Sequence, residues 1–380
     1  MAISFSRRTR CELAQTEDLE PLAVFKDFPV FMGCTHGPAS DDVLSDMCWS
    51  ISRSSGLIQL DQLLPLELLY PEAHGSGAVG GIWRRHHQEF ASFVHAFAPT
   101  AVLEIGGSHG VLALEYQQLQ DIVWHIVEPN PMPVAGCRAT FTKGFFSRQT
   151  PLPCSFDMVT HSHVLEHIYH PLAFFEDVSK VLAVGGMLCF TLPHMEVMLE
   201  RKYSNCLNFE HTLYLTEPYL EMLLARHGFE LVRKAYFMED HSIFYAARKT
   251  GAARAYTLPA GLYQKNKKTF DDYVQYFRQL VTNLNHRLAA CDAPVYIFGA
   301  HVFTQYLVAF GLATGKIRGV LDNDAAKWGK RLSGTRLIVE SPRALAGIIQ
   351  ARVILKVGAY AQEIKADIFE NINRDVVYWE

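Results

Sequence analysis

The chain has 380 residues, of which 49% are hydrophobic and 19% charged, and 35 lysines and arginines against 39 aspartates and glutamates leave a formal net charge of −4. This composition excludes a disordered chain. The near-neutral charge argues against nucleic acid as the main partner, because neutralising phosphates needs a basic excess. At roughly 150 residues per domain, the length predicts two or three domains.

Membrane and secretory segments are not indicated by the sequence. No run of 18 or more apolar residues occurs, and the start of the chain lacks the apolar stretch of a signal peptide. The 8 cysteines are scattered without the spacing of a disulfide framework. We therefore expect a cytoplasmic location, reduced cysteines and no membrane partner.

Four zones follow one another along the chain. Residues 1–80 are rich in Pro, Gly, Ser and Asp and contain one clear strand-like run at 56–60, so we expect an irregular N-terminal cap. Residues 81–248 alternate between helical segments and short apolar runs, which predicts a parallel-rich, doubly wound α/β sheet. The apolar runs lie at 101–105, 122–127, 156–160, 187–192, 230–232 and 242–246.

The C-terminal part predicts a helix and a smaller α/β unit. Residues 249–291 contain an irregular linker and then apolar residues at helical spacing between Phe270 and Leu288, which predict one long amphipathic helix. Residues 292–380 form the last zone, with apolar runs at 295–299, 317–321, 353–357 and 376–378. The fold class expected for the whole chain is therefore α/β, with two Rossmann-like units.

A glycine turn after the run at 101–105 is the sharpest local signal. Gly106, Gly107, Ser108 and Gly110 come after an apolar strand and precede a helical segment, so a ligand can approach the backbone closely there. A tight strand-to-helix connection without a ligand is the alternative explanation.

Two acidic residues flank this turn. Glu128 ends the next strand-like run, 24 residues after Glu104, where a carboxylate can accept both hydroxyls of a ribose. Glu104 lies two residues before Gly106 and would repel a pyrophosphate, but it can hold the cationic amino-acid portion of S-adenosylmethionine. The charges therefore favour this methyl donor over NAD.

Two further motifs extend this pattern. Residues 156–167 run from Phe156-Asp157 to Leu165-Glu166-His167, and residues 181–188 contain Gly185-Gly186 before another apolar run. In order and spacing, residues 82–248 resemble class I S-adenosylmethionine-dependent methyltransferases. The resemblance implies a Rossmann-like donor domain, S-adenosylmethionine as cofactor, and contributions to its site from His163 and Leu165.

The outer regions resemble a narrower group, the bacterial sugar C-methyltransferases. The similar segments are 56–60 and 65–77 near the N-terminus, and 297–300, 319–324, 327–330, 334–335 and 341–342 near the C-terminus. The resemblance implies methyl transfer to a carbon next to a ketone of a nucleotide-linked deoxysugar, through an enolate formed by a base. The partner expected is a small nucleotide-linked sugar, and the oligomeric state stays open.

The resemblance also suggests catalytic residues. Glu210 and His211 match the family's catalytic position, and histidine suits a general base because its unperturbed pKa lies near working pH. Tyr214, three residues on, is a candidate proton donor or enolate partner. Tyr70 and His74 are second candidates for catalysis or sugar contact. The alternative for Glu210 and His211 is capping of the helix expected near residue 216.

No metal is predicted. The resembling family usually carries an N-terminal zinc site built from two CxxC pairs, whereas this region has only Cys11, Cys34 and Cys48, with His36 as a further candidate ligand. His163, Glu166 and His167 have the order of an inverted zincin motif. That segment is already explained by the methyltransferase pattern.

Two other functions remain open. An O- or N-methyltransferase acting on a sugar would use the same donor domain. A nicotinamide-dependent sugar oxidoreductase is suggested by Tyr245 and Lys249, which have the spacing of a short-chain dehydrogenase pair but lie on a strand-like run.

A second nucleotide-like pattern occurs in the last zone. Gly299 is followed 23 residues later by Asp322, but the turn lacks repeated glycines, and we expect it to frame the substrate pocket. Lys327, Lys330 and Arg331 are candidate contacts for a diphosphate.

Overall fold

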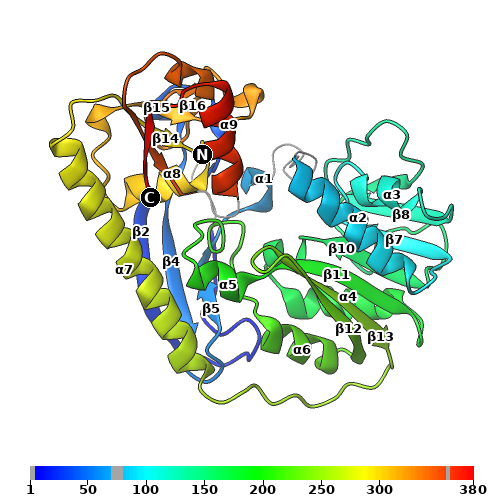
Figure 1. The fold of residues 1–380 in the computed structure, drawn as a ribbon. Coiled ribbons are helices and arrows are strands. Elements are labelled where there is room, and N and C mark those ends of the chain that lie inside the picture. The colour runs from blue at the N-terminus through cyan, green and yellow to red at the C-terminus, as the bar shows by residue number, and fades with distance from the viewer. Residues whose placement is uncertain (1–4, 70–79, 357–359) are drawn as a thin grey trace.

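The computed structural model describes residues 5–69, 80–356 and 360–380, and Figure 1 shows how these parts are arranged. Three sheets of three or more strands and one long helix organise the described chain. Tyr70 and His74 lie outside the described residues. None of the helices in the described ranges combines the length and hydrophobicity that crossing a bilayer requires.

The N-terminal region contains a three-stranded antiparallel sheet, which corrects the expectation of an irregular cap. Its strands are, in spatial order, β2 (Leu19–Pro29), β4 (Leu44–Ser52) and β5 (Ile58–Leu60). In β4, Met47, Trp49 and Ile51 alternate with more polar residues, and all three are at most 1% exposed. The signal was this alternation of period two, which a search for continuous apolar runs overlooks.

Shorter elements complete this region and the connections elsewhere. They are β1 (Ser6–Arg7) paired with β6 (Gln62–Leu63), β3 (Cys34–Thr35) paired with β16 (Arg331–Leu332), α1 (Leu66–Leu69), and the 3-10 turns η1 (Ala39–Asp41), η3 (Leu165–His167), η4 (Thr314–Lys316), η5 (Ala325–Lys327) and η6 (Pro342–Leu345).

A seven-stranded sheet forms the middle of the chain, with the order β12-β13-β11-β10-β7-β8-β9. Every neighbouring pair is parallel except the two that involve β13. The predicted apolar runs all lie within or overlap these strands, whereas the more polar β9 was not predicted. The strands are β7 (Ala101–Ile105), β8 (Val123–Glu128), β9 (Thr140–Lys143), β10 (Met158–Ser162), β11 (Met187–Pro193), β12 (Phe229–Phe237) and β13 (Ser242–Lys249).

Five helices accompany this sheet: α2 (Gly81–His95), α3 (Val111–Tyr116), α4 (Pro171–Val181), α5 (Met195–Glu200) and α6 (Glu217–Arg226). All seven residues of β11 are buried, as expected for an inner strand covered on both faces.

The strand order reverses beside β7. This strand pairs with β8 on one side and with β10 on the other, so the connections after them run in opposite directions. In open α/β sheets the ligand crevice lies at such a switch point, outside the carboxyl ends of the strands. We therefore expect the ligand site at the loops that follow β7 and β10.

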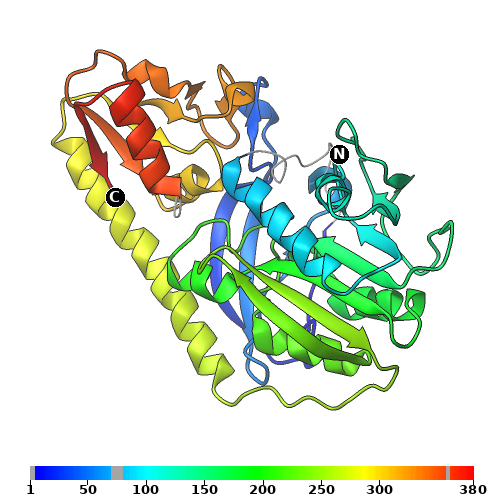
Figure 2. The same ribbon diagram turned by 45° about the vertical axis from the view of Figure 1, so that its right-hand side comes forward.

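The long amphipathic helix predicted after the linker is α7 (Leu262–Ala289). It runs along the side of β2 and β4 that faces away from the seven-stranded sheet, as both views show (Figure 1, Figure 2). Its buried face includes Phe270, Tyr273 and Phe277, spaced by three and four residues.

The C-terminal residues form a second parallel sheet, as the sequence predicted, with the order β17-β15-β14-β18-β19. Its elements are β14 (Val295–Phe298), α8 (Val302–Ala309), β15 (Ile317–Leu321), β17 (Val339–Glu340), β18 (Ala351–Leu355), α9 (Ala361–Asn371) and β19 (Val376–Trp379).

A buried ion pair joins this unit to the N-terminal region. Arg331 Nη1 and Nη2 contact the two carboxylate oxygens of Asp42 at 2.6 and 2.8 Å, and the guanidinium also donates to the carbonyl of Gly37. Arg331 is only 9% exposed and does not line the cavity described below, which corrects its prediction as a diphosphate contact.

Candidate active site

A cavity of about 1220 Å³ lies at the switch point. Its walls come from the seven-stranded sheet, the loop after β11 and the C-terminal unit, and they include Gly106, Glu128, His211, His301 and Lys327. A site for one small ligand usually occupies about 300–1,000 Å³. The cavity is therefore large enough for two small molecules side by side.

The glycine turn after β7 leaves no room for side chains. Gly106 has φ +70°, and a Cβ there would lie 2.7 Å from Cγ2 of Val164. A Cβ on Gly107 would lie 2.7 Å from Cδ of Glu104. Only glycine fits these positions, and the exposed backbone forms a cradle that a ligand can approach.

Glu128 stands beside this cradle at the end of β8. Its Oε2 accepts a hydrogen bond from the backbone N–H of Ser108 at 3.0 Å, and its Oε1 accepts one from the N–H of Asn130 at 3.0 Å. Glu128 and Ser108 both line the cavity. Each carboxylate oxygen keeps a further lone pair, so the arrangement is compatible with acceptance of ribose hydroxyls.

Glu104 also lines the cavity, although it is only 2% exposed. Its Oε2 accepts a hydrogen bond from Nε1 of Trp124 at 2.7 Å. Burial raises the pKa of the carboxyl to about 7. A cationic group beside it would restore the charged form.

Two predicted donor contacts do not line the cavity. Leu165 is completely buried in the hydrophobic core. Gly110, with φ +71°, begins α3, and a Cβ there would lie 2.7 Å from Sγ of Cys137. Gly110 is therefore needed for the turn and its packing, and Leu165 for the core, because the motif serves the fold as well as the ligand.

His163 lies at the other side of the switch point, after β10. Its Nδ1 is 3.1 Å from Oε1 of Glu166, and its Nε2 is 2.8 Å from Oγ of Ser242. Its backbone is left-handed, with φ +52°, which is uncommon outside glycine and asparagine. His163 lines the cavity, and its contribution to the donor site stays a prediction.

The loop that carries Glu210 and His211 is held by Asn208. Its Oδ1 accepts hydrogen bonds from the backbone N–H of Glu210 at 2.8 Å and of His211 at 2.9 Å. The next residues are bonded to β5 of the N-terminal sheet, through Leu60 N to Thr212 O and Tyr214 N to Ile58 O, both at 2.9 Å. The N-terminal sheet therefore positions this loop.

His211 has a defined tautomer. Its Nδ1 lies 2.7 Å from the carbonyl oxygen of Asn205, which can only accept, so Nδ1 carries the proton and Nε2 keeps its lone pair. Burial lowers the pKa of His211, and the nearby Glu166 opposes this only in part. The ring is therefore neutral near pH 7.

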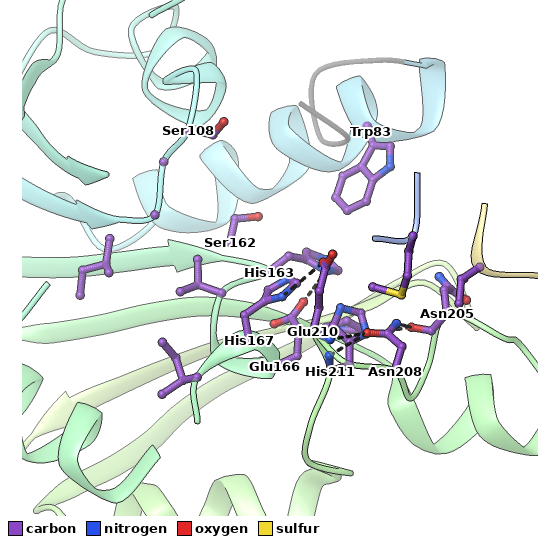
Figure 3. A pocket seen from close by; sticks show the side chains of 18 of the residues that line it. Trp83, Ser108, Ser162, His163, Glu166, His167, Asn205, Asn208, Glu210 and His211 are labelled. Carbon is purple, nitrogen blue, oxygen red and sulfur yellow. Dashed lines mark hydrogen bonds and ion pairs between the residues drawn. The ribbon is translucent and has the colours of Figure 1, made fainter. Parts of the chain in front are cut away.

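Glu166 and His167 stand beside His211, as Figure 3 shows. The rings of His167 and His211 are 4.8 Å apart between centres, and Nδ1 of His167 is 3.9 Å from Oε2 of Glu210. One potential ligand atom each from Glu166, His167 and His211 lies within 4.8 Å of the others. Burial raises the pKa of Glu166 to about 7.

The contacts of His211 are made with residues other than Glu210. Its Nδ1–H donates to the Asn205 carbonyl, which orients the ring, and the carboxylate that acts on its pKa is Glu166. Sequence reasoning missed Asn205 and Asn208. Only the conformation of the loop shows their role, because both residues lie in an irregular segment.

Tyr214 does not line the cavity. It is 1% exposed and belongs to the main hydrophobic core, in the segment that bonds to β5. Burial raises its pKa well above the ordinary value. The prediction of Tyr214 as a proton donor or enolate partner is therefore wrong, because its bond to β5 turns the side chain into the core.

Tyr245 and Lys249 do not form a dehydrogenase pair. Both lie on β13. Tyr245 is completely buried and stacks on Phe190 with 4.9 Å between ring centres, and Nζ of Lys249 donates to backbone carbonyls of Ser179 and Leu182.

The three N-terminal cysteines lie apart from one another in the fold. Cys11 is buried with its Sγ 3.3 Å from Oγ of Ser55, Cys34 lies on β3 with its Sγ 3.6 Å from the Ala300 carbonyl, and Cys48 lies on β4. Within the described ranges, none of them belongs to a group of three potential metal ligands.

The C-terminal unit contributes one wall of the cavity through His301, Phe303 and Lys327. Nζ of Lys327 is 3.0 Å from Oδ2 of Asp322, and the side chain of His301 caps α8 by accepting the N–H of Phe303 at 3.1 Å. The expected pocket-framing role of this unit is consistent with these positions.

Residues 82–234 match the model of a family described as "Methyltransferase domain". This segment covers less than half of the chain and holds the glycine turn, His163 and the Glu210–His211 loop. No match was found among curated proteins.

Similar solved structures include magnesium protoporphyrin IX methyltransferase from Synechocystis PCC 6803 with bound SAH, which has 16% identity and a TM-score of 0.36 over 45% of this chain and 88% of that one. The N-methyltransferase NodS from Bradyrhizobium japonicum WM9 has 16% identity and a TM-score of 0.33 over 44% and 96%.

The cavity fits the cofactor of this family. The glycine cradle, the carboxylate of Glu128 and the buried Glu104 all line the cavity, and their chemistry suits a nucleoside with a cationic amino-acid tail. Residues 82–234 are therefore a class I methyltransferase domain, and the protein is an S-adenosylmethionine-dependent methyltransferase.

Proposed function

We propose that this methyltransferase transfers a methyl group to a carbon next to a ketone of a nucleotide-linked deoxysugar, with His211 as the base. The observation that carries the proposal is the lone pair on Nε2 of His211, which lies in the same cavity as the glycine cradle. Methyl transfer to a carbon next to a ketone needs a base that removes the α-proton. Binding of the methyl donor needs no such base.

His211 is suited to this step. A neutral imidazole accepts the α-proton at Nε2, and the Asn205 carbonyl stabilises the resulting imidazolium through the Nδ1–H bond of 2.7 Å. Glu166 lies close enough to attract the new positive charge, because it already acts on the pKa of His211. Proton transfer of this kind contributes typically about 10² to 10⁴-fold to the rate.

The remaining groups bind and orient. Glu104, Gly106, Gly107, Ser108 and Glu128 would hold S-adenosylmethionine, which supplies an electrophilic methyl group when bound. Much of the acceleration would come from positioning the acceptor carbon beside that group.

The acceptor's nucleotide would meet the wall formed by the C-terminal unit. Lys327, which is paired with Asp322, and Lys356 both bring cations to this wall, and cations there favour an anionic acceptor. The cavity volume of about 1220 Å³ is consistent with a donor and a large acceptor bound together. The histidine base would also serve methylation of a hydroxyl or an amine on a sugar, so the atom methylated must be tested directly.

The test begins with a screen of nucleotide-linked ketosugars by thermal shift in the presence of S-adenosylhomocysteine. For a sugar that binds, deuterium at the α-carbon should wash out without the methyl donor, and carbon NMR of the product should show a new C–CH₃ signal. Both signals should be lost in His211→Ala. A product with an O–CH₃ or N–CH₃ signal, or washout unchanged in the variant, would refute the proposal.

A further inference from the structure

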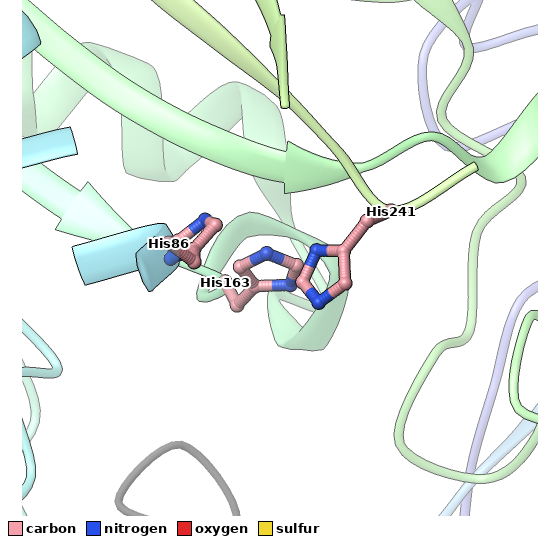
Figure 4. A group of neighbouring side chains, drawn as sticks. All are labelled: His86, His163 and His241. Carbon is pink, nitrogen blue, oxygen red and sulfur yellow. The ribbon is translucent and has the colours of Figure 1, made fainter. Parts of the chain in front are cut away.

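A second cluster of histidines borders the cavity. His86 of α2, His163 after β10 and His241 in the turn between β12 and β13 converge from three elements, as Figure 4 shows. Their ring centres are 5.2, 5.5 and 5.9 Å apart. One nitrogen of each lies within 4.8 Å of the others. The function proposed above uses neither His86 nor His241.

The hydrogen bonds within the cluster leave one nitrogen of His86 without a partner. Oγ of Ser242 lies 2.8 Å from Nε2 of His163 and 2.6 Å from Nδ1 of His241, so one hydroxyl can accept from one ring and donate to the other. Nε2 of His86 lies 3.2 Å from Oγ1 of Thr191. Nδ1 of His86 is buried and has no hydrogen-bond partner among the described residues. A buried polar atom without a partner is destabilising, and a ligand of the cluster would supply that partner.

One ligand is already oriented as in known metal sites. Nδ1 of His163 lies 3.1 Å from a carboxylate oxygen of Glu166, which fixes the ring and leaves Nε2 directed toward Ser242 and the cluster. Carboxylate–histidine–metal arrangements of this kind are usual. The left-handed backbone at His163, with φ +52°, also holds this residue in an uncommon conformation.

The cluster opens to the cavity. His163 and His241 line it together with Trp83, whose ring centre is 4.9 Å from each of them. The geometry points to a site for a divalent transition-metal ion, with Zn²⁺ as the occupant, held by His86, His163 and His241. Three histidines leave one coordination position open, and here that position faces the cavity, where an oxygen of the methyl acceptor can take it.

The ligand chemistry argues for this metal class and this cluster. Three imidazole nitrogens suit Zn²⁺, Co²⁺ and Ni²⁺, and they are poor ligands for Mg²⁺ or Ca²⁺. In the neighbouring group of Glu166, His167 and His211, Nδ1 of His211 is already bonded to the Asn205 carbonyl. Metal–nitrogen bonds of about 2.0–2.1 Å require the three rings to close slightly on the ion.

The experiment uses the full chain, stripped with a chelator and titrated with Co²⁺ while the visible absorption of the metal is recorded. We expect one Co²⁺ per chain, with the intense bands of a four- or five-coordinate ion, displaced by Zn²⁺. His241→Ala should weaken binding at least about 100-fold, because loss of a group that merely orients a ligand already costs about 10–100-fold. His95→Ala, on α2 outside the cluster, is the matched control and should bind as the parent does.

Three results would overturn this site. They are a weak octahedral spectrum or no binding by the folded parent chain, binding unchanged in His241→Ala, and binding lost in His211→Ala but retained in His241→Ala. Affinity for S-adenosylhomocysteine, measured in each variant, shows that the fold and the donor site are intact. Because the readout is metal binding, failure of the metal site leaves the proposed C-methylation untouched, and failure of that reaction leaves the metal site untouched.

Discussion

The two α/β units share a local motif but use it differently. In the first, the strand β7 leads into Gly106 and Gly107, and Glu128 ends the neighbouring strand β8. In the second, β14 leads into Gly299, and Asp322 comes directly after the neighbouring strand β15. Both acidic side chains accept a backbone N–H from the turn beside them, Glu128 from Ser108 and Asp322 from Ala300.

The two turns differ in whether they line the cavity. In both units a Cβ on the first glycine would lie 2.7 Å from a side chain, Cγ2 of Val164 beside Gly106 and Nε2 of His301 beside Gly299. Gly106 and Glu128 line the cavity, whereas neither Gly299 nor Asp322 is among the residues that line it. Asp322 is instead paired with Lys327 at 3.0 Å. A strand, a glycine and an acidic residue are therefore not sufficient for a nucleotide site.

The largest effect should separate His211 from His301, two of the histidines that the units bring to the cavity. His211→Ala should lower turnover about 10² to 10⁴-fold, because the proton acceptor is lost, with affinity for S-adenosylhomocysteine unchanged. His301→Ala should change turnover only a few fold and cost about 1 kcal/mol of stability, through loss of the α8 cap. Turnover rates and isothermal calorimetry check both, and equal losses of turnover in the two variants would contradict this contrast.

The next effect concerns how the second unit is attached. Arg331→Ala should lower the free energy of unfolding by about 3–5 kcal/mol, because it leaves the buried carboxylate of Asp42 without its partner. Arg148→Ala, which breaks an exposed pair with Glu176, should cost no more than about 1 kcal/mol. Urea unfolding measures both. A loss in Arg331→Ala as small as in the control would mean that this pair does not hold the unit.

A smaller effect compares the two acidic residues. Glu128→Gln should weaken binding of S-adenosylhomocysteine about tenfold or more, since hydrogen bonds to charged groups contribute about 1.5–3 kcal/mol. Asp322→Asn should leave this affinity unchanged. Calorimetry on the two variants decides, and weaker binding in Asp322→Asn would show that the second turn also contacts the donor.

The smallest effect is a pH dependence that belongs to the first unit alone. Glu104, whose pKa burial raises to about 7, is uncharged below that pH in the free protein and cannot attract the donor's ammonium group. The affinity for S-adenosylhomocysteine should therefore fall as pH drops below about 7, by up to tenfold per pH unit. Glu104→Gln should remove this dependence, whereas Glu128→Gln should keep it.

The same shift has a consequence for stability. The ordinary pKa of a glutamate is 4.5, so the unfolded chain releases this proton at lower pH than the folded protein does. The contribution of Glu104 to stability should therefore decrease as pH rises from about 4.5 to about 7. Thermal unfolding of the parent chain and of Glu104→Gln across this range measures the difference.

Local sequence patterns were sufficient to predict most strands of the seven-stranded sheet. β7 and β11 lie where continuous apolar runs placed them, because strands buried on both faces need such runs. β4 was missed because its apolar residues alternate with polar ones, and β9 because its residues TFTK are only partly buried. The sequence also placed Gly106, Glu128 and His211 in the order that a methyltransferase resemblance requires.

The tertiary structure alone decided which residues share the cavity. Tyr214 lies outside the cavity because residues 212–214 pair with β5, which lies more than 150 residues earlier in the chain. His86 and His241 were brought to His163 from α2 and from the turn after β12. Spacing along the chain reports only neighbours within one element, whereas a site is assembled where several elements meet. The sequence by itself therefore determined the fold class and the methyl donor, and the packing of three regions around one cavity determined the partners of each candidate catalytic side chain.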